Sequence, residues 1–361
     1  MIAPPVLLIL PRPPGSAARR GSSLKPIVHE ITAKSALNRS KGLRADWTLN
    51  PYRGCAHACR YCYARATHQY LKLGAGADFD QVLFAKLNIA EVLRRELARP
   101  GWRAGACGPR QSVTIGTAAD PYQPIDGRYR LTRGCLEAIA EAAVPCGLLT
   151  KGTLVVRDVD VLAAIAARSR LTVHFSLSTV DPTLARALEP SAPPPASRLR
   201  ALERLRANGI DARVLLCPVI PGLTDAPAQI EEVIRAAADH GASGLDAGPL
   251  RLAPLVKEHF LSYLATVRPQ LVPAYRRGYC WGADPPRAYA ERLARLVAET
   301  KDRVGFADRP PARVEGSVAD LAATAEPQAS DRFEQLALLE PTALLNGIPT
   351  SDGIDESDFR N

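Results

Sequence analysis

The sequence has 361 residues, of which 47% are hydrophobic and 23% charged, with a formal net charge of +9 and eight cysteines. This composition is globular and excludes a fibrous repeat or a chain that is disordered throughout. The apolar run nearest the start, residues 6–10, is too short for a membrane span or the core of a signal peptide. We therefore expect a cytoplasmic protein without membrane association, whose reduced cysteines are available to bind metal.

The predicted elements alternate along the middle of the chain. Residues 1–25, with proline pairs and a Gly-Ser stretch, predict a flexible arm. Strands are then predicted at 47–50, 113–116, 147–150, 171–178, 212–219 and 244–252, and helices at 90–97, 132–143, 158–167, 197–208, 226–239 and 255–267. Because parallel strands need crossover connections, this order predicts an α/β fold, an open or closed (β/α)6 TIM-type barrel over residues 26–268.

The two ends of the chain differ in charge. After a predicted helical extension at 269–307, residues 308–361 hold eleven acidic residues and four arginines, which predicts a disordered acidic tail with one short helix around 333–339. Residues 1–307 consequently carry a net charge of +16. This basic body is compatible with nucleic acid or phosphorylated substrates, and solvated arginines are the alternative.

Polar residues close several predicted strands, where the chemistry of a parallel barrel gathers. Asp120 follows the second strand and is a candidate site residue there. Alternatively, it caps the turn that Pro121 begins. Lys151 follows the third strand. Its side chain either belongs to a site at the barrel mouth or is solvated. Ser176 and Ser178 lie two apart on the fourth strand, so both face the same side of the sheet.

The stretch 50–65, NPYRGCAHACRYCYAR, places Cys55, Cys59 and Cys62 in a C-x3-C-x2-C pattern. Three thiolates so close in sequence can converge on one metal centre. A structural zinc site needs a fourth ligand, for which His57 and His68 keep an alternative open. A 4Fe-4S cluster held by three cysteines keeps one iron open for substrate chemistry.

This pattern, with Tyr61 as the aromatic before the third cysteine, resembles the signature of the radical S-adenosylmethionine (SAM) superfamily. The resemblance spans residues 25–305 and is to the spore-photolyase-like group of bacterial radical SAM proteins. It is carried by GTAADPYQPID (116–126), TKGTLVVRDVDVL (150–162), FSLSTVD (175–181), LEPSAPPPASRL (188–199) and CPVIPGLTD (217–225). It implies a partial (β/α)6 TIM-type barrel over residues 26–268 and a 4Fe-4S cluster on Cys55, Cys59 and Cys62. It also implies reductive cleavage of SAM to a 5′-deoxyadenosyl radical that abstracts hydrogen from a substrate. The resemblance further implies a reducing partner such as flavodoxin or ferredoxin.

The resemblance also implies residues that bind SAM. Tyr61 would pack near the adenine, Lys151 would pair with the carboxylate, and Asp120 would meet the amino group. The remaining implied contacts come from Ser176 and Ser178 with the ribose or amino acid moiety, Glu189 and Arg198 flanking the proline-rich loop, and the backbone at Ile220 edging the adenine. An ion pair between Glu189 and Arg198, and a mere tight turn at Ile220, are the alternatives.

The other cysteines share no ligand spacing. Cys135, Cys146 and Cys217 lie in apolar surroundings and are predicted core residues, and Cys280 is a weak candidate for a hydrogen-atom donor.

Spore photolyase has a cysteine just ahead of the acidic site, but residues 116–119 contain none. The substrate therefore stays unidentified. Two alternatives are a lyase-like enzyme that repairs or modifies nucleic acid and a zinc-binding module without catalysis.

Overall fold

The computed structural model describes residues 26–40, 45–102 and 111–309. Its main element is a seven-stranded sheet, in which six neighbouring strands are parallel and the edge strand β2 is antiparallel. The order across the sheet is β10 (Leu245–Pro249), β9 (Ala212–Val219), β8 (Leu171–Ser176), β7 (Cys146–Thr150), β6 (Val113–Ile115), β3 (Trp47–Leu49) and β2 (Leu37–Arg39). Because β10 and β2 form opposite edges, the sheet stays open. This confirms the predicted α/β fold with a partial barrel.

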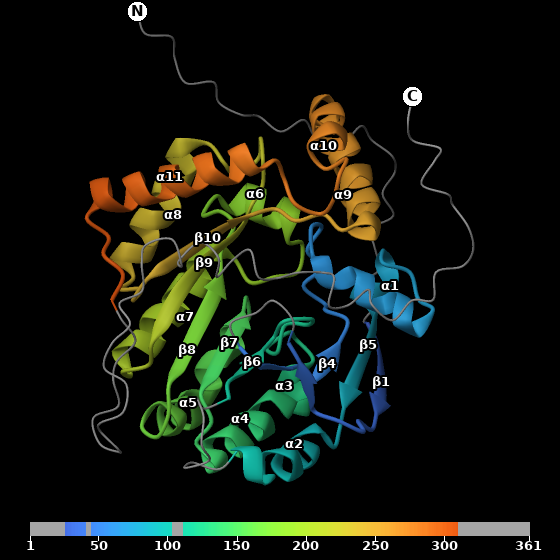
Figure 1. Cartoon of the computed structure of the whole chain (residues 1–361), viewed down its shortest axis with the longest axis vertical. Helices are drawn as coiled ribbons and strands as arrows, with labels where there is room; N and C mark the ends of the chain where they lie inside the picture. Colours follow the sequence, from blue (N-terminus) through green and yellow to red (C-terminus); the bar gives the residue numbers. More distant parts are fainter. Residues whose placement is uncertain (1–25, 41–44, 103–110, 310–361) are drawn as a thin grey trace, which may run out of the picture.

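Helices connect successive parallel strands, as crossover connections require. In chain order they are α2 (Ile89–Leu97), α4 (Leu131–Ala142), α5 (Val159–Ala166), α7 (Pro195–Ala207) and α8 (Pro227–Asp239), and α9 (Pro254–Val267) follows β10 (Figure 1). The helical extension then comprises η4 (Pro269–Leu271), α10 (Val272–Gly278) and α11 (Arg287–Val304). Helix α11 packs against α8 and β10. Five shorter helices lie in the connections, namely η1 (Tyr63–Leu71), α1 (Ala77–Gln81), α3 (Asp126–Tyr129), η3 (Thr153–Asp158) and α6 (Pro182–Leu188), and η2 (Pro100–Trp102) follows α2.

Alternation along the strands separates the core from the site. Val173 and Phe175 of β8 and Val214 and Leu216 of β9 are buried in the main apolar cluster with the surrounding helices. Successive side chains of a strand point to opposite faces of the sheet. Ser176 therefore faces away from this cluster, and the polar ends of the strands stay available for chemistry.

Two predicted strands are shorter in the structure. The strand predicted at 171–178 ends at Ser176, which is the last residue of β8 paired with β9 and whose hydroxyl donates to the carbonyl of Cys217 (3.1 Å). Ser178 therefore lies just beyond the strand. The strand predicted at 244–252 spans only Leu245–Pro249, and its pairing with β9 is irregular near Pro249.

A second sheet was not predicted. It has the order β1 (Ile27–Ile31), β5 (Val82–Lys86) and β4 (Tyr52–Arg53), with β1 parallel and β4 antiparallel to β5. Strand β4 has two residues and most of β1 is exposed, so no apolar alternation marks either strand in the sequence. This sheet matters because β4 leads directly into the loop with the three cysteines.

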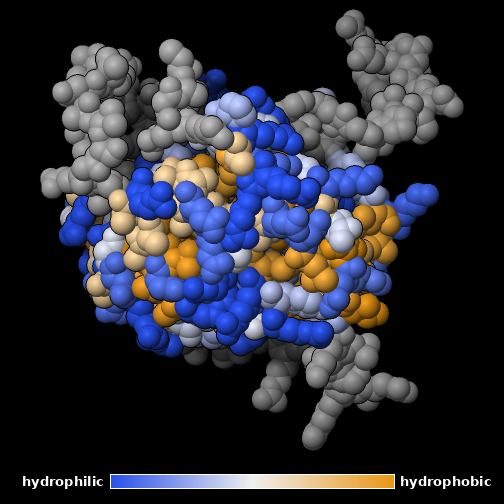
Figure 2. All heavy atoms as spheres, turned by 90° about the horizontal axis from the view of Figure 1, so that it is seen from below, coloured by the Kyte–Doolittle hydropathy of each residue, from blue (hydrophilic) through white to orange (hydrophobic). Residues whose placement is uncertain are grey.

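The predicted arm at 1–25 and the predicted helix around 333–339 lie outside the described residues. Among the residues that are described, no helix is both long and apolar enough to cross a membrane. Seen from below, over α2 and α4, most of the surface is hydrophilic, with apolar side chains between the polar ones (Figure 2).

Candidate active site at the three-cysteine loop

The three cysteines lie in the loop between β4 and η1, which the surrounding backbone fixes. Gly54 has φ of 73°, and a Cβ there would lie 2.8 Å from the carbonyl oxygen of Val82. Only glycine fits this left-handed position without strain. The next amide, of Cys55, donates to the carbonyl of Phe79 (3.0 Å), and Arg65 Nε donates to that of Cys59 (2.9 Å). The loop is thus held by β5, α1 and η1.

The three thiols are free and close enough to influence one another. Cys55 and Cys59 are buried, and Cys62 is half-buried. Burial raises the pKa of Cys59 well above its ordinary value, and the nearby Lys151 opposes this rise. Burial and the charge of Cys55 raise the pKa of Cys62 to about 11. The three thiols are therefore near enough for the ionisation of one to affect that of another.

The loop supplies three cysteine thiols as a donor set. Thiolates that share one zinc ion lie about 2.3 Å from it, which brings their sulfur atoms within about 4 Å of each other. Within the described part of the chain, no three His, Cys, Asp or Glu side chains are close enough to hold a single ion. Three cysteines that each hold a different corner of a cluster are farther apart. The donor set therefore suits a 4Fe-4S cluster with one iron open.

A buried ion pair forms the wall beside this loop. Glu189 and Arg198 are ion-paired, and each side chain is only 2% exposed. The Tyr61 hydroxyl donates to Glu189 and lies 3.0 Å from the Ser178 hydroxyl. Burial would raise the pKa of Glu189, but Arg198 and Lys151 hold it below its ordinary value. The structure thus shows the ion pair that the sequence analysis left as an alternative to ligand contact.

Lys151 extends into the same wall instead of into solvent. Its side chain is 14% exposed, and Nζ donates to Ser176 Oγ (2.7 Å) and lies 3.8 Å from Glu189. Nζ also lies 5.7 Å from the centre of the Tyr61 ring. Burial would lower the pKa of Lys151, but the charges of Glu189 and Cys59 outweigh it and raise that pKa. The structure brings Tyr61, Lys151, Ser176, Ser178, Glu189 and Arg198 together next to Cys59.

Asp120 is held between two loops. Its carboxylate accepts hydrogen bonds from the Thr150 hydroxyl (2.7 Å) and from the amides of Lys151 (2.6 Å) and Tyr122 (2.9 Å). It also lies 3.3 Å from His57 Nδ1. Burial would raise the pKa of Asp120, but His57 and these hydrogen bonds lower it to about 2. The bond to Tyr122 is the turn-capping contact that the sequence analysis gave as the alternative role.

Ile220, whose backbone was expected either to edge the adenine or to form a tight turn, lies beside the cysteine loop. It is fully buried in an apolar cluster with Cys59, Tyr61 and Leu188. Its amide donates to the Thr224 hydroxyl (2.8 Å). The turn at Ile220 therefore sits directly against the cysteine loop.

Two other cysteines differ in exposure. Cys280, between α10 and α11, is exposed, so packing leaves its thiol at the surface. Cys217 was predicted to be a core residue, which is wrong, because it is only half-buried. On β9 it lies two residues beyond Leu215, the partner of Ser176, and so shares the polar face of the sheet. The charge of Lys151 acts on its thiol, whose pKa burial raises to about 11.

Sequence reasoning missed the residues that support the cysteine loop from outside. They are Tyr52, Gln123, Asp126, Arg157 and Asp158, all with polar contacts described below. The local signal was present, because Gln123, Asp126, Arg157 and Asp158 lie in two of the stretches that carried the family resemblance. The contacts that join these stretches to each other and to the cysteine loop were not visible, since their partners are 31 or more residues apart in the sequence.

Comparison with known proteins gives the family. The sequence model described as "Radical SAM superfamily" matches residues 49–237. An uncharacterised protein of Mycobacterium tuberculosis is 40% identical over 302 residues, 82% of this chain and 87% of that protein. An uncharacterised protein of Methanocaldococcus jannaschii is 29% identical over 196 residues, 54% of this chain and 69% of that protein.

Solved structures give the same fold. Spore photoproduct lyase complexed with dinucleoside spore photoproduct matches with a TM-score of 0.61 and 16% identity over 77% of this chain and 79% of that one. A variant of that lyase with bound AdoMet and dinucleoside spore photoproduct gives a TM-score of 0.58, with 16% identity over 77% and 78% of the two chains. At this identity the likeness concerns the fold alone. Together with the family match, it shows that the chain belongs to the radical SAM superfamily.

Proposed function

We propose that this protein is a radical SAM enzyme whose 4Fe-4S cluster is held by Cys55, Cys59 and Cys62. When bound, the cluster and SAM supply a 5′-deoxyadenosyl radical for hydrogen abstraction from a substrate. The observation that carries this proposal is the meeting of three free, mutually interacting thiols with a buried wall of one lysine and one ion pair. An electron donor such as flavodoxin or ferredoxin would reduce the cluster.

The residues of the wall suit the two ends of SAM. Lys151 is a compact cation at the edge of the wall, suited to the carboxylate of the methionine moiety. Ser176 and Ser178 offer hydroxyls, and Tyr61 and Ile220 offer buried apolar surface beside Cys59. Glu189 and Arg198 hold Tyr61 and Lys151 in place. Asp120 orients the backbone of Lys151, because its carboxylate accepts the Lys151 amide.

The test is anaerobic loading with iron and sulfide, followed by reduction in the presence of SAM. We expect visible absorption from an iron-sulfur cluster and formation of 5′-deoxyadenosine and methionine. A fully loaded cluster that cleaves no SAM would refute the proposed function. Zinc instead of iron in protein purified without oxygen would favour the binding-module alternative.

Replacing Lys151 by glutamine should weaken SAM binding while leaving the cluster in place. Loss of one charge-assisted contact costs about 1.5–3 kcal/mol, so we expect an increase of about tenfold or more in the Kd for SAM. Equilibrium dialysis with cluster-loaded protein measures this Kd. Lys72→Gln is the control, because Lys72 is exposed. Equal Kd values in the two variants would remove Lys151 from the SAM site.

A second candidate function is repair or modification of nucleic acid, which the net charge of +16 on residues 1–307 favours. Neutralising several phosphates releases counterions, so such binding falls steeply with added salt. We expect the affinity for DNA duplexes to drop by about 1000-fold or more between 50 and 200 mM salt if this function is correct. No binding at low salt would exclude it and leave the radical SAM assignment untouched.

A further inference from the structure

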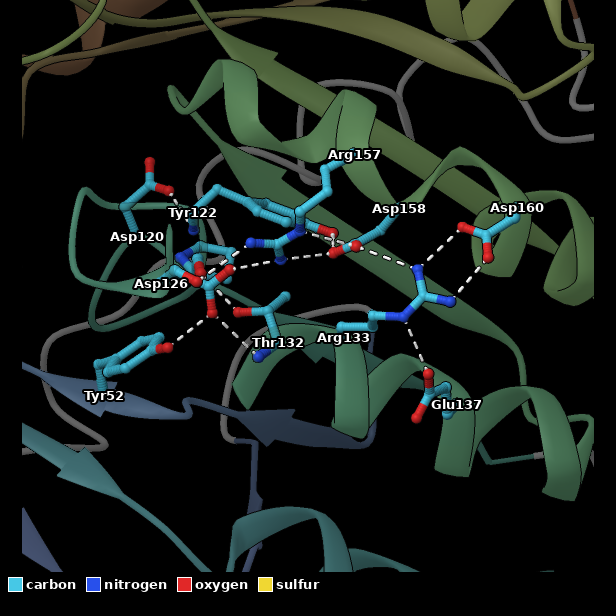
Figure 3. Close-up of polar contacts among 11 residues, drawn as sticks. Tyr52, Asp120, Tyr122, Asp126, Thr132, Arg133, Glu137, Arg157, Asp158 and Asp160 are labelled. Atoms are coloured by element: carbon cyan, nitrogen blue, oxygen red, sulfur yellow. Dashed lines mark hydrogen bonds and ion pairs between the residues drawn. The ribbon is translucent and has the colours of Figure 1, made fainter. Parts of the chain in front are cut away.

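Asp126 and Asp158 are two fully buried carboxylates that share one partner, Arg157. Asp126 accepts hydrogen bonds from the Tyr52 hydroxyl (2.6 Å), the Thr132 amide (3.1 Å) and Arg157 (2.8 Å). Asp158 accepts from the Tyr122 hydroxyl (3.0 Å) and from Arg157 Nε (2.9 Å). Figure 3 shows the Arg157 guanidinium between the two carboxylates, so that one cation bridges both. Buried charges persist only when they are paired in this way.

Gln123 bonds the cysteine loop on both sides of Cys55. Its side chain is fully buried. Its Oε1 accepts the amide of Ala56 (2.9 Å), and its Nε2 donates to the carbonyl of Gly54 (3.0 Å). A side-chain amide is the group that offers an acceptor and a donor side by side. The peptide units that precede and follow Cys55 are therefore tied to one side chain.

The same short stretch, residues 120–126, contacts the loop at two more places. Asp120 lies 3.3 Å from His57, and Asp126 accepts the hydroxyl of Tyr52. The contacts thus fall at 52, 54, 56 and 57, on either side of Cys55. Through Arg157 and Asp158, the stretch is in turn fixed to η3, which begins two residues after Lys151.

We propose that Gln123 is a positioning residue that fixes the Cys55 thiol for the cluster, with the Asp126–Arg157–Asp158 bridge keeping residues 120–126 rigid. The cluster part of this inference rests on the proposed function. Without Gln123, the two peptide units beside Cys55 lose their shared anchor, so the thiol samples more positions. Loss of outer-shell support at a metal site costs about 10–100-fold in metal affinity.

The first experiment uses the full chain without metal. Gln123→Met keeps the side-chain length and removes both hydrogen bonds, and Gln123→Glu keeps the acceptor but sets a carboxylate against the Gly54 carbonyl. Alkylation of each cysteine by iodoacetamide is followed by peptide mass spectrometry. We expect Cys55 to react about tenfold faster in Gln123→Met and by an intermediate factor in Gln123→Glu, with Cys135 unchanged. Cys135 is fully buried, so its labelling reports global unfolding.

Gln229→Met is the matched control. Gln229 also bridges two backbone groups, because it accepts the Ala226 amide (3.3 Å) and donates to the Leu223 carbonyl (3.1 Å), but it lies on α8. We expect no faster labelling of Cys55 in this variant. If Gln123→Met labels Cys135 as well, and so unfolds, Gln123→Glu decides the question. If a folded Gln123 variant alkylates at Cys55 no faster than the wild-type protein does, the proposal is overturned.

The second experiment measures iron release to a chelator from cluster-loaded protein. We expect release about tenfold faster from Gln123→Met than from wild type and Gln229→Met, together with a changed electron paramagnetic resonance signal of the reduced cluster. Equal release rates and signals would contradict the positioning role. A wild-type chain that takes up no cluster would refute the proposed function instead, and the alkylation result would then decide alone whether Gln123 fixes Cys55.

Discussion

Replacing Cys59 by alanine is expected to abolish cluster binding and all cleavage of SAM. Cys59 is in direct contact with the proposed site, because it packs with Tyr61 and Ile220 and its thiol interacts with Lys151 and Glu189. A cluster with two remaining ligands is not held, so the loss should exceed the about 10–100-fold that an outer-shell change costs. Iron content, visible absorption and 5′-deoxyadenosine formation measure the effect.

Cys146→Ala is the matched control for this prediction. Cys146 is also a free, buried thiol, but it is the first residue of β7, at the opposite end of that strand from Lys151. We expect full cluster content in this variant, with a modest loss of stability of about 1 kcal/mol from the small cavity. If Cys59→Ala keeps a wild-type cluster, the three-cysteine assignment fails.

Replacing Arg198 by leucine is expected to destabilise the fold by about 3–5 kcal/mol, because it leaves the Glu189 carboxylate buried without its main partner. Urea unfolding of the metal-free protein measures this difference. Arg200→Leu on the same helix is the control, since Arg200 is exposed and should change stability by less than about 0.5 kcal/mol. The double variant Glu189→Leu/Arg198→Leu should recover at least half of the loss.

The stability difference between wild type and Arg198→Leu should also depend on pH. Arg198 and Lys151 hold the pKa of Glu189 below its ordinary value, which is about 4.3 in an unfolded chain. A lowered folded pKa stabilises the protein above the unfolded pKa, and this contribution is lost as the pH falls through the folded value. The difference in the free energy of unfolding between wild type and Arg198→Leu should therefore have its full value at pH 7 and become smaller below about pH 4. A difference that widens on acidification would contradict the assignment of the charge to Glu189.

The alternation of apolar strands and helical stretches was sufficient to predict the six parallel strands of the main sheet, but not its antiparallel edge strand β2. The strand predicted at 212–219 coincides with β9, because the apolar run at 214–219 marks a buried parallel strand. The small sheet was missed, since a strand of two residues leaves no periodic pattern. The end of β8 at Ser176 was missed as well, because it depends on where the pairing with β9 stops.

For the site, the spacing of Cys55, Cys59 and Cys62 by itself was enough to predict the proposed metal-binding loop, because ligands so close in sequence lie in one short segment. Only the tertiary structure decided what surrounds that loop. It paired Glu189 with Arg198, turned Lys151 toward Tyr61 and placed Gln123 across Cys55. These contacts join segments that are far apart in the chain or on separate elements. Their partners are chosen by strand order and register, which no local sequence pattern encodes.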